Sequence, residues 1–303
     1  MPLATVVREQ TKTSEYTKHD LLFKELIQTF FKEFIDIFFS DVHRHIDYHD
    51  MTFLSEEVHT DLHDGKTRRL DIIVETKLKG EGSVIIVHVE PQSYGQPDFH
   101  ERMFHYYSLL YNKYRKPIVP IAVFSYDEKR YEQDAFTIEF PFFHVLTFNF
   151  LTLELRKKNW RDYIESDNPA AAALLSKMGY TNQERIEVKK EFLRMLVRMP
   201  LNPAKENMIY GFFESYLKLN EKEEAKLHEE LGKMEDGEKV MELTISYEEK
   251  GKKEGRKEGR IEGEQAAKQE VAVEMLRKGV SIEFIAEVTH LEQVEIEKLR
   301  NRL

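Results

Sequence analysis

The segment at residues 69–93, RLDIIVETKLKGEGSVIIVHVEPQS, predicts a β-hairpin, and this hairpin constrains the fold more than any other part of the chain. Residues 70–78 and 83–89 are rich in β-branched and other apolar side chains, which is typical of strands. Gly80 and Gly82 lie between the two runs and can adopt the positive φ angles that a short turn needs. We therefore expect two antiparallel strands joined by a tight connection.

Two carboxylates interrupt the apolar runs of this hairpin. Asp71 follows the first apolar residue of one strand, and Glu90 ends the other. Strand pairing would bring both to the same end of the hairpin, where burial without a cation or a donor costs free energy. Carboxylates on adjacent strand ends can hold Mg²⁺, which takes oxygen ligands and keeps several waters. The alternative is that both acids only mark where the strands reach solvent.

Several motifs in the chain resemble the PD-(D/E)XK nuclease superfamily. Asp71 followed by Glu90 and Gln92 is similar to its Asp…Glu-x-Lys signature, with Gln in place of the usual Lys. The E-x-Q-S form, the sequence HDLLFK at residues 19–24, and Arg102-Met103 resemble the recombination-promoting nuclease family, whose members are also described as transposases. The Gly-, Glu- and Arg-rich tail is similar to that family as well. The D…E-x-Q signature alone is short and weakly specific.

The resemblance implies an α/β fold with a restriction-endonuclease-like α-β-β-β-α-β core and a helical C-terminal extension. It implies a Mg²⁺-dependent endonuclease, with Mn²⁺ as an alternative metal, acting on double-stranded DNA. Asp71, Glu90 and the backbone carbonyl of Pro91 would hold the metal. Gln92 would orient water or phosphate through hydrogen bonds, because a neutral amide lacks the charge of a Lys.

Other charged residues are candidates to support this site. The resemblance implies that Glu25, on the first helix, would be a further metal ligand. Glu75 is four residues after Asp71 on the same predicted strand, so its side chain would lie on the same face, and it is a fallback ligand. The alternative for each charged residue of this group is an ordinary solvated charge or a surface ion pair. The DNA contacts implied by the resemblance, or placed beside the hairpin, are Lys24, Arg69, Ser93 and Arg102.

The remaining periodicities predict the elements around the hairpin. Apolar residues at helical spacing predict helices from residue 18 onward and over 96–115, and the continuous apolar run 118–125 predicts a central strand. Residues 42–50, which are rich in histidine, predict a loop. Further strands are expected at 51–58, 136–140 and 143–155, and further helices at 170–178, 183–199 and 206–219.

The C-terminal part combines high charge with a regular glycine spacing. Residues 220–249 predict a solvated helix. Gly251, Gly255, Gly259 and Gly263 recur every four residues, which fits either a weak helix or a flexible linker, because each glycine costs up to about 1 kcal/mol in a helix. Residues 266–303 predict short helices around a cluster of Ile282, Ile285, Val288, Leu291, Ile296 and Leu299.

This tail has the spacing of a helix-turn-helix, but its second helix carries acids. Glu292, Glu295 and Glu297 have the wrong sign for a DNA groove, so we favour a protein contact and expect a homo-oligomer formed through the tail. The predicted divisions are a loose lead at 1–17, the nuclease-like core at 18–165, a helical extension at 166–250, and the linker and tail module at 251–303.

The composition of the chain excludes several classes of protein and of site. The chain has 303 residues, a net charge of -10 and no cysteine, which excludes a disulfide framework and a thiolate metal site. No run approaches the roughly 20 apolar residues of a membrane helix, and the start lacks a secretory pattern, so we expect a cytoplasmic protein without a membrane partner. The acidic balance argues against a general nucleic-acid coat protein.

The leading functional interpretation is a metal-dependent DNA endonuclease linked to recombination or mobile elements. The alternative is a catalytically inactive DNA-binding or scaffold protein that retains the nuclease fold, or an assembly protein whose tail sets the oligomeric state. The histidine pairs His59/His63 and His100/His105 are interpreted as surface residues, because neither spacing suits chelation.

Overall fold

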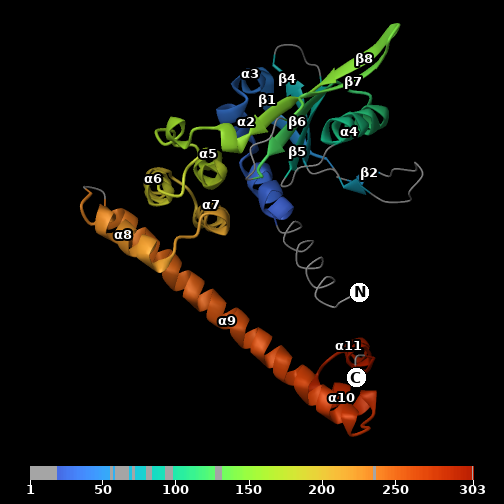
Figure 1. Ribbon diagram of the computed structural model, residues 1–303, viewed down its shortest axis with the longest axis vertical. Coiled ribbons are helices and arrows are strands. Elements are labelled where there is room, and N and C mark those ends of the chain that lie inside the picture. Colours follow the sequence, from blue (N-terminus) through green and yellow to red (C-terminus); the bar gives the residue numbers. More distant parts are fainter. Residues whose placement is uncertain are drawn as a thin grey trace. The chain divides into compact units, whose positions relative to one another are not determined.

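The computed structural model describes residues 19–54, 57–58, 68–69, 72–79, 84–92, 98–126, 132–234, 237–301 and 303. The chain forms two compact units, Met1–Gly237 and Glu238–Leu303, which are considered separately below. The elements of both units are labelled in Figure 1.

A mixed five-stranded sheet organises the first unit, in the order β1-β4-β5-β6-β9. Strand β4 is antiparallel to both β1 and β5, whereas β6 is parallel to both β5 and β9. The α/β class expected from the sequence is therefore confirmed. The strands are β1 (Ile46–Phe53), β4 (Ile72–Leu78), β5 (Val84–Gln92), β6 (Ile118–Phe124) and β9 (Leu151–Glu154).

The predicted hairpin is confirmed as the pair β4 and β5. Its register runs without a break from Ile72 opposite Val89 to Lys77 opposite Val84. Consecutive residues of β4 are buried, because the sheet is covered on both faces, and this explains the continuous apolar run. Of the turn predicted at residues 79–82, Lys79 is described as a turn residue, and residues 80–82 lie outside the described residues.

Helix α4 (Phe99–Tyr114) covers one face of this sheet (Figure 1). Its predicted apolar stripe is buried, and Met103 packs with Ala122 and Phe124 of β6. The helix ends where Arg115 adopts a left-handed conformation (φ 53), two residues before Pro117.

Helical segments that precede the sheet in the sequence supply a second apolar layer. The predicted apolar face is buried at Phe23, Leu26 and Ile27, but Phe30 lies in a turn, so the pattern is divided between two helices. The segments are residues 19–29, α2 (Phe31–Phe38) and α3 (Ser40–His45).

The loop predicted at residues 42–50 is wrong. Helix α3 extends to His45, and β1 starts at Ile46 rather than at the predicted residue 51. β1 is an edge strand with one neighbour, and much of it reaches solvent, so its sequence IDYHDMTF carries polar residues without being a loop. Two short strands follow, β2 (Glu57–Val58) and β3 (Arg68–Arg69), paired with each other.

The strands predicted at 136–140 and 143–155 form a second hairpin and one sheet strand. β7 (Ala135–Phe140) pairs with β8 (Phe143–Asn149) in a separate two-stranded sheet. The chain then changes direction at Phe150, whose N–H donates to the carbonyl of Asp134 at 3.0 Å, before β9 joins the main sheet.

Four α-helices follow the sheet within the first unit, and asparagines cap three of them. The side chains of Asn168, Asn202 and Asn220 accept hydrogen bonds from backbone N–H groups at the starts of α5, α7 and α8. The helices predicted at residues 170–178, 183–199 and 206–219 are confirmed as α5, α6 and α7. The helices are α5 (Pro169–Leu174), α6 (Arg185–Arg198), α7 (Pro203–Tyr216) and α8 (Glu221–Leu231), with 3₁₀ turns at Leu155–Lys157, Trp160–Asp162 and Leu175–Lys177.

The single solvated helix predicted at 220–249 is wrong. The segment is divided between α8 and the start of the next helix, and Leu227 and Leu231 of α8 are fully buried. The high charge concealed this because most Glu and Lys residues of α8 are exposed, while two leucines spaced four residues apart are buried.

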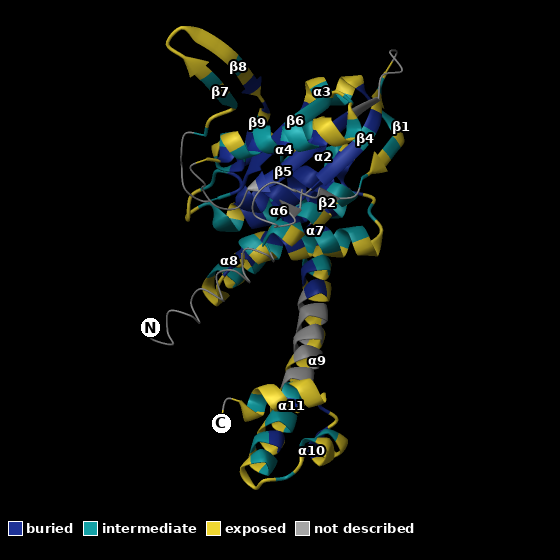
Figure 2. Ribbon diagram, turned by 90° about the vertical axis from the view of Figure 1, so that its right-hand side faces the viewer, coloured by how far each residue is buried: buried dark blue, intermediate teal, exposed yellow. Residues whose placement is uncertain are grey.

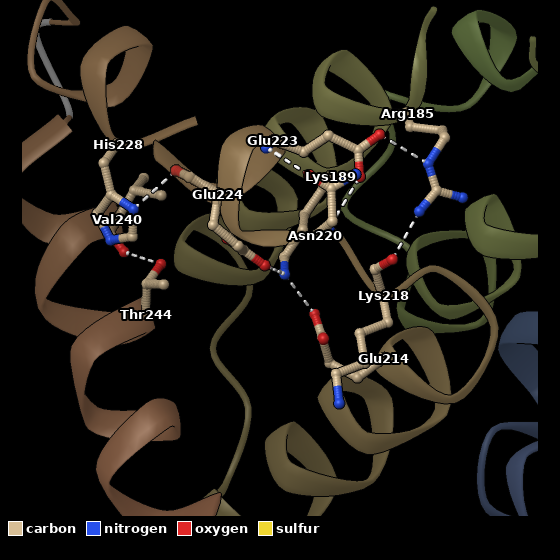
Figure 3. Close-up of polar contacts among 10 residues, drawn as sticks. All are labelled: Arg185, Lys189, Glu214, Lys218, Asn220, Glu223, Glu224, His228, Val240 and Thr244. Atoms are coloured by element: carbon tan, nitrogen blue, oxygen red, sulfur yellow. Dashed lines mark hydrogen bonds and ion pairs between the residues drawn. The ribbon is translucent and has the colours of Figure 1, made fainter. Parts of the chain in front are cut away.

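A buried cation joins α6, α7 and α8 (Figure 3). Lys189 of α6 is only 2% exposed, and its Nζ lies 2.8 Å from Glu214 of α7 and 2.7 Å from Glu224 of α8. Burial raises the pKa of Glu214 above its usual value, although Lys189 opposes this shift. One ammonium group therefore balances two carboxylates from different helices.

The second unit consists of one long and two short helices. Helix α9 (Gly237–Arg277) has 41 residues and includes the glycine repeat. Of the two alternatives for this repeat, a weak helix and a flexible linker, the helix is therefore confirmed. α10 (Ile282–Thr289) starts after Ser281, whose Oγ accepts from the N–H of Phe284. α11 (Gln293–Arg300) completes the unit.

These three helices enclose a small apolar core of Ala272, Ile285, Leu291 and Ile296. Gly279, with φ 77, follows the end of the long helix, where its positive φ stops the helix. Val288 was expected in the core but is 51% exposed, because it falls on the outer side of α10.

Replacing Lys189 with Ala is expected to destabilise the first unit by about 3 kcal/mol at pH 7, because two partly buried carboxylates lose their buried cation. Burial raises the pKa of Glu214, and without Lys189 this carboxyl would take up a proton more readily in the folded state than in the unfolded chain. The deficit should therefore shrink as pH falls and grow as pH rises through the folded pKa of Glu214. Urea unfolding at several pH values measures this. Lys190→Ala, which removes a more exposed ion pair to Glu230, is the matched control and should cost at most about 1 kcal/mol.

The carboxylate of Glu184 provides a second titration test. A hydrogen bond from Arg161, and then hydrogen bonds from Thr181, lower its pKa to about 2. Its contribution to stability is present above the ordinary glutamate pKa and is lost as pH falls towards 2. Arg161→Ala should move this pKa upward, as measured by NMR titration of the side-chain carboxyl. An unchanged pKa in the variant would contradict the assignment.

Candidate functional site

Glu90 is a buried carboxylate near the carboxyl end of β5, with 5% of its surface exposed. Side chains alternate along a strand, so Glu90 shares a face with His88 and Ile86, and Ile86 packs with Tyr106 and Leu110 of α4. Glu90 therefore lies on the side of the sheet that α4 covers. A carboxylate at such a depth requires compensation by positive charge or hydrogen bonds.

Arg102 of α4 and His88 supply groups close to this carboxylate. A guanidinium nitrogen of Arg102 lies 3.7 Å from Oε1 of Glu90, and Nε2 of His88 lies 3.5 Å from Oε2. The guanidinium is also 5.0 Å from the ring centre of Phe99 and 5.8 Å from that of Tyr106. These aromatic contacts orient Arg102 toward the sheet. Its side chain is 19% exposed.

The second predicted ligand, Asp71, lies outside the described residues. The register of its neighbours is nevertheless fixed, because Ile72 pairs with Val89. Asp71 directly precedes Ile72 in the sequence, and Glu90 directly follows Val89.

The residues after Glu90 continue into the parallel part of the sheet. Pro91 is buried and lies opposite Val123, and Gln92 lies opposite Phe124. The side chain of Gln92 is not among the described ones, and Ser93 lies outside the described residues. The backbone of Arg69 belongs to β3, in the small sheet beside β2, and its side chain is likewise not described.

The first helix contributes His19 rather than Glu25 to the sheet. Nε2 of His19 lies 3.1 Å from Oγ of Ser125, which directly follows β6, and its ring packs on Phe23 and Tyr216 at 5.0 and 4.9 Å. Burial, together with the charge of Asp20, raises the pKa of Tyr216. His19 thus ties the helix to the carboxyl end of the parallel strands.

The two remaining charged candidates of this helix differ in exposure. Lys24 is partly buried. Glu25 is exposed, on the side of the helix opposite to Phe23, Leu26 and Ile27, so it is directed away from the sheet. The helix geometry thus gives no support to Glu25 as a metal ligand.

Glu75, the fallback ligand, forms an ion pair away from Glu90. Its carboxylate pairs with the ammonium group of Lys116, which lies two residues before β6 starts. Glu75 is also opposite Ile86, toward the other end of the hairpin from Glu90. Of the histidine pairs, His59 and His63 lie outside the described residues, and the His100 ring packs against Phe136 at 5.8 Å.

Within the described ranges, no group of three or more His, Asp or Glu side chains could hold a metal ion. No helix described by the structure is both long enough and apolar enough to cross a bilayer. Comparison with known proteins found no matching family model, no matching curated protein and no matching solved structure.

Sequence reasoning did not identify His88 and Ser125, although both carry a usable signal. His88 precedes Glu90 by two residues, and that spacing places two side chains on one face of a strand. Ser125 is the first polar residue after an apolar strand, and this position is the signal in the sequence. The structure shows that the residue is fully buried rather than at a solvent-facing strand end. Only the packing of the first helix identifies its partner as His19.

A double-mutant cycle tests the pairing at Glu90. Arg102→Met is expected to cost about 2 kcal/mol of stability, because it leaves a buried carboxylate without its nearby cation. Combining it with Glu90→Gln should restore part of the loss, with a coupling energy between about 0.5 and 3 kcal/mol from denaturant unfolding. Additive effects of the two substitutions would contradict a direct interaction.

Proposed function

We propose that this protein is a metal-dependent DNA endonuclease that hydrolyses phosphodiester bonds in double-stranded DNA. The observation that carries the proposal is the register of β4 and β5, in which Ile72 lies opposite Val89. Asp71 directly precedes Ile72, and Glu90 directly follows Val89. Because the two strands are antiparallel, both positions lead toward the same end of the hairpin. This order is the one expected of an Asp…Glu-x-Gln site.

The order of elements supports the same proposal. A helical segment, β1, the β4–β5 hairpin, α4 and the parallel strand β6 follow one another as in an α-β-β-β-α-β core. The short β2 and β3 strands between β1 and β4 form a separate sheet and leave this order intact. On this proposal, residues 18–165 form the nuclease-like core.

The available donors fit Mg²⁺, which binds proteins through one or two carboxylates and retains water. Asp71 and Glu90 would hold the ion, with the backbone carbonyl of Pro91 as a further oxygen, and Mn²⁺ would be accepted by the same oxygens. A bound ion of this kind polarises the phosphate and lowers the pKa of the attacking water.

The other residues of the chain would position the nucleic acid. Gln92 would orient water or a phosphate oxygen by hydrogen bonds. Arg102, whose guanidinium lies 3.7 Å from Glu90, would balance the charge of this carboxylate. Lys24, Arg69 and Ser93 would contact the DNA backbone, where cationic and hydroxyl groups bind phosphate oxygens. The biological role proposed with this activity is recombination or the movement of genetic elements.

A non-catalytic DNA-binding or scaffold function is the second candidate, and one contact favours it. Because Arg102 lies 3.7 Å from Glu90, the carboxylate already has a cation nearby. If this pairing is purely structural, the fold needs no metal at this position.

Plasmid nicking by the full chain in Mg²⁺, in Mn²⁺ and in EDTA separates the two candidates. Asp71→Ala and Glu90→Gln are each expected to reduce metal-dependent nicking by about 100-fold or more, because loss of a ligand exceeds the usual effect of an outer-shell change. Mn²⁺ binding, measured by electron paramagnetic resonance, should weaken in the same variants.

Glu75→Gln is the matched control, since it removes a carboxylate from the same strand pair but away from the proposed site. It should retain nicking and Mn²⁺ binding. Full activity in Asp71→Ala would refute the site, and a folded wild-type chain that binds DNA but never cuts it would favour the second candidate.

A further inference from the structure

The hairpin of β7 and β8, here called the ribbon, ends in a group of exposed aromatic side chains. Phe140, Phe142 and Phe143 are 54%, 86% and 60% exposed, and Val145 beside them is 43% exposed. Figure 2 shows this end of the ribbon in the colour of exposed residues, extended away from the main sheet. A large exposed apolar cluster of this kind marks an interaction surface.

The ribbon has one polar and one apolar face. On the polar face, the hydroxyl of Thr147 lies 3.3 Å from that of Thr137 and 3.2 Å from Nε2 of His144, which is paired with Glu139. An extra residue in β8 shifts the register after Ile138, and Phe140 then pairs with Phe143. Alternation places these side chains together on the apolar face, which comprises Phe136, Ile138, Phe140, Phe143, Leu146 and Phe148.

Helix α4 covers only the base of this apolar face. The rings of Phe104 and Phe136 are 5.2 Å apart, and those of Tyr107 and Phe148 are 4.9 Å apart. Toward the tip, the same face continues through Phe140 and Phe143, which are exposed. An isolated two-stranded ribbon is marginally stable in water, so the outer half requires a further layer.

The charge around the ribbon restricts the kind of partner. Residues 132–150 include Glu132, Asp134 and Glu139 but no Lys or Arg. Nucleic acids and anionic membranes both present phosphate, which binds cationic side chains and is repelled by acids. The ribbon therefore fits a protein surface better than a phosphate surface.

The exposed area suits one side of a protein interface. The three phenylalanines together expose the equivalent of two whole residues, or roughly 400 Å² at about 200 Å² each. A standard interface buries about 800 Å² per partner, of which somewhat more than half is apolar. The ribbon tip and its polar margin at Glu139 and His144 can supply that composition.

We propose that the apolar face of the ribbon packs against the same face of a second copy of this chain, across a two-fold axis. A two-fold contact uses one surface twice, so it needs self-complementarity, which two flat aromatic faces provide. The contact adds the missing layer over Phe140 and Phe143. The acidic residues remain at the solvent-exposed margin, where water screens their repulsion.

A single spin label tests this contact in the full chain. The protein has no cysteine, so Thr147→Cys introduces one labelling position, on the polar face of the ribbon. Any dipolar distance must then join two copies. We expect a distance of roughly 20–30 Å, because packed sheets lie about 10 Å apart and the labels extend outward from both.

Phe140→Ser with Phe143→Ser, in the labelled chain, is expected to abolish this distance and raise the dimer dissociation constant at least tenfold by sedimentation. Both side chains are exposed, so the circular dichroism spectrum of the folded chain should be unchanged. The control Leu21→Ser changes a similarly exposed apolar residue outside the ribbon and the tail, and should retain the distance.

Three outcomes would overturn the proposal. One is the absence of the short distance in the parent chain at about 100 μM, and another is its persistence in the double serine variant. The third is loss of binding to vesicles of phosphatidylcholine and phosphatidylglycerol, or to plasmid DNA, in the serine variant, which would assign the ribbon to a phosphate surface.

Discussion

The burial of Glu90 is the constraint on which the arrangement of the first unit depends. Strand β5 lies between β4 and β6 and is covered on both faces, so nearly every side chain along it is apolar. A carboxylate near the end of such a strand is tolerated only with charge or hydrogen-bond compensation. Arg102 provides part of it, and its position depends on α4 packing against the sheet through Phe99 and Tyr106. The proposed site and the core of the fold are therefore coupled.

The two layers around the sheet serve different purposes. Helix α4 brings a cation to Glu90 on one side, whereas His19 reaches Ser125 beyond β6 and contacts Tyr216 of α7. The second contact links the first helix, the sheet and the helical extension at the carboxyl end of the parallel strands. Ligand sites in open α/β sheets commonly lie at this end. The location is thus consistent with the proposed nuclease chemistry.

Charge is handled differently in the helical extension and in the ribbon. In the extension, Lys189 neutralises two acids inside the packing of three helices, so the charges hold the elements together. In the ribbon, the acids lie on or near an exposed aromatic surface, where they exclude phosphate and leave the apolar face for protein contacts. The net charge of the chain conceals this difference because it averages over both regions.

The sequence by itself determined the β4–β5 hairpin, helix α4, strand β6 and most of the later helices, because their apolar periodicities are long and regular. It did not determine β1 or the split of the acidic segment, where polar residues on partly exposed elements resemble loops or solvated helices. Glu90 could be singled out from its place in an apolar run. Its contact with Arg102, the pairing of His19 with Ser125 and the outward direction of Glu25 were decided only by tertiary packing, since they join residues or faces whose orientation no local pattern fixes.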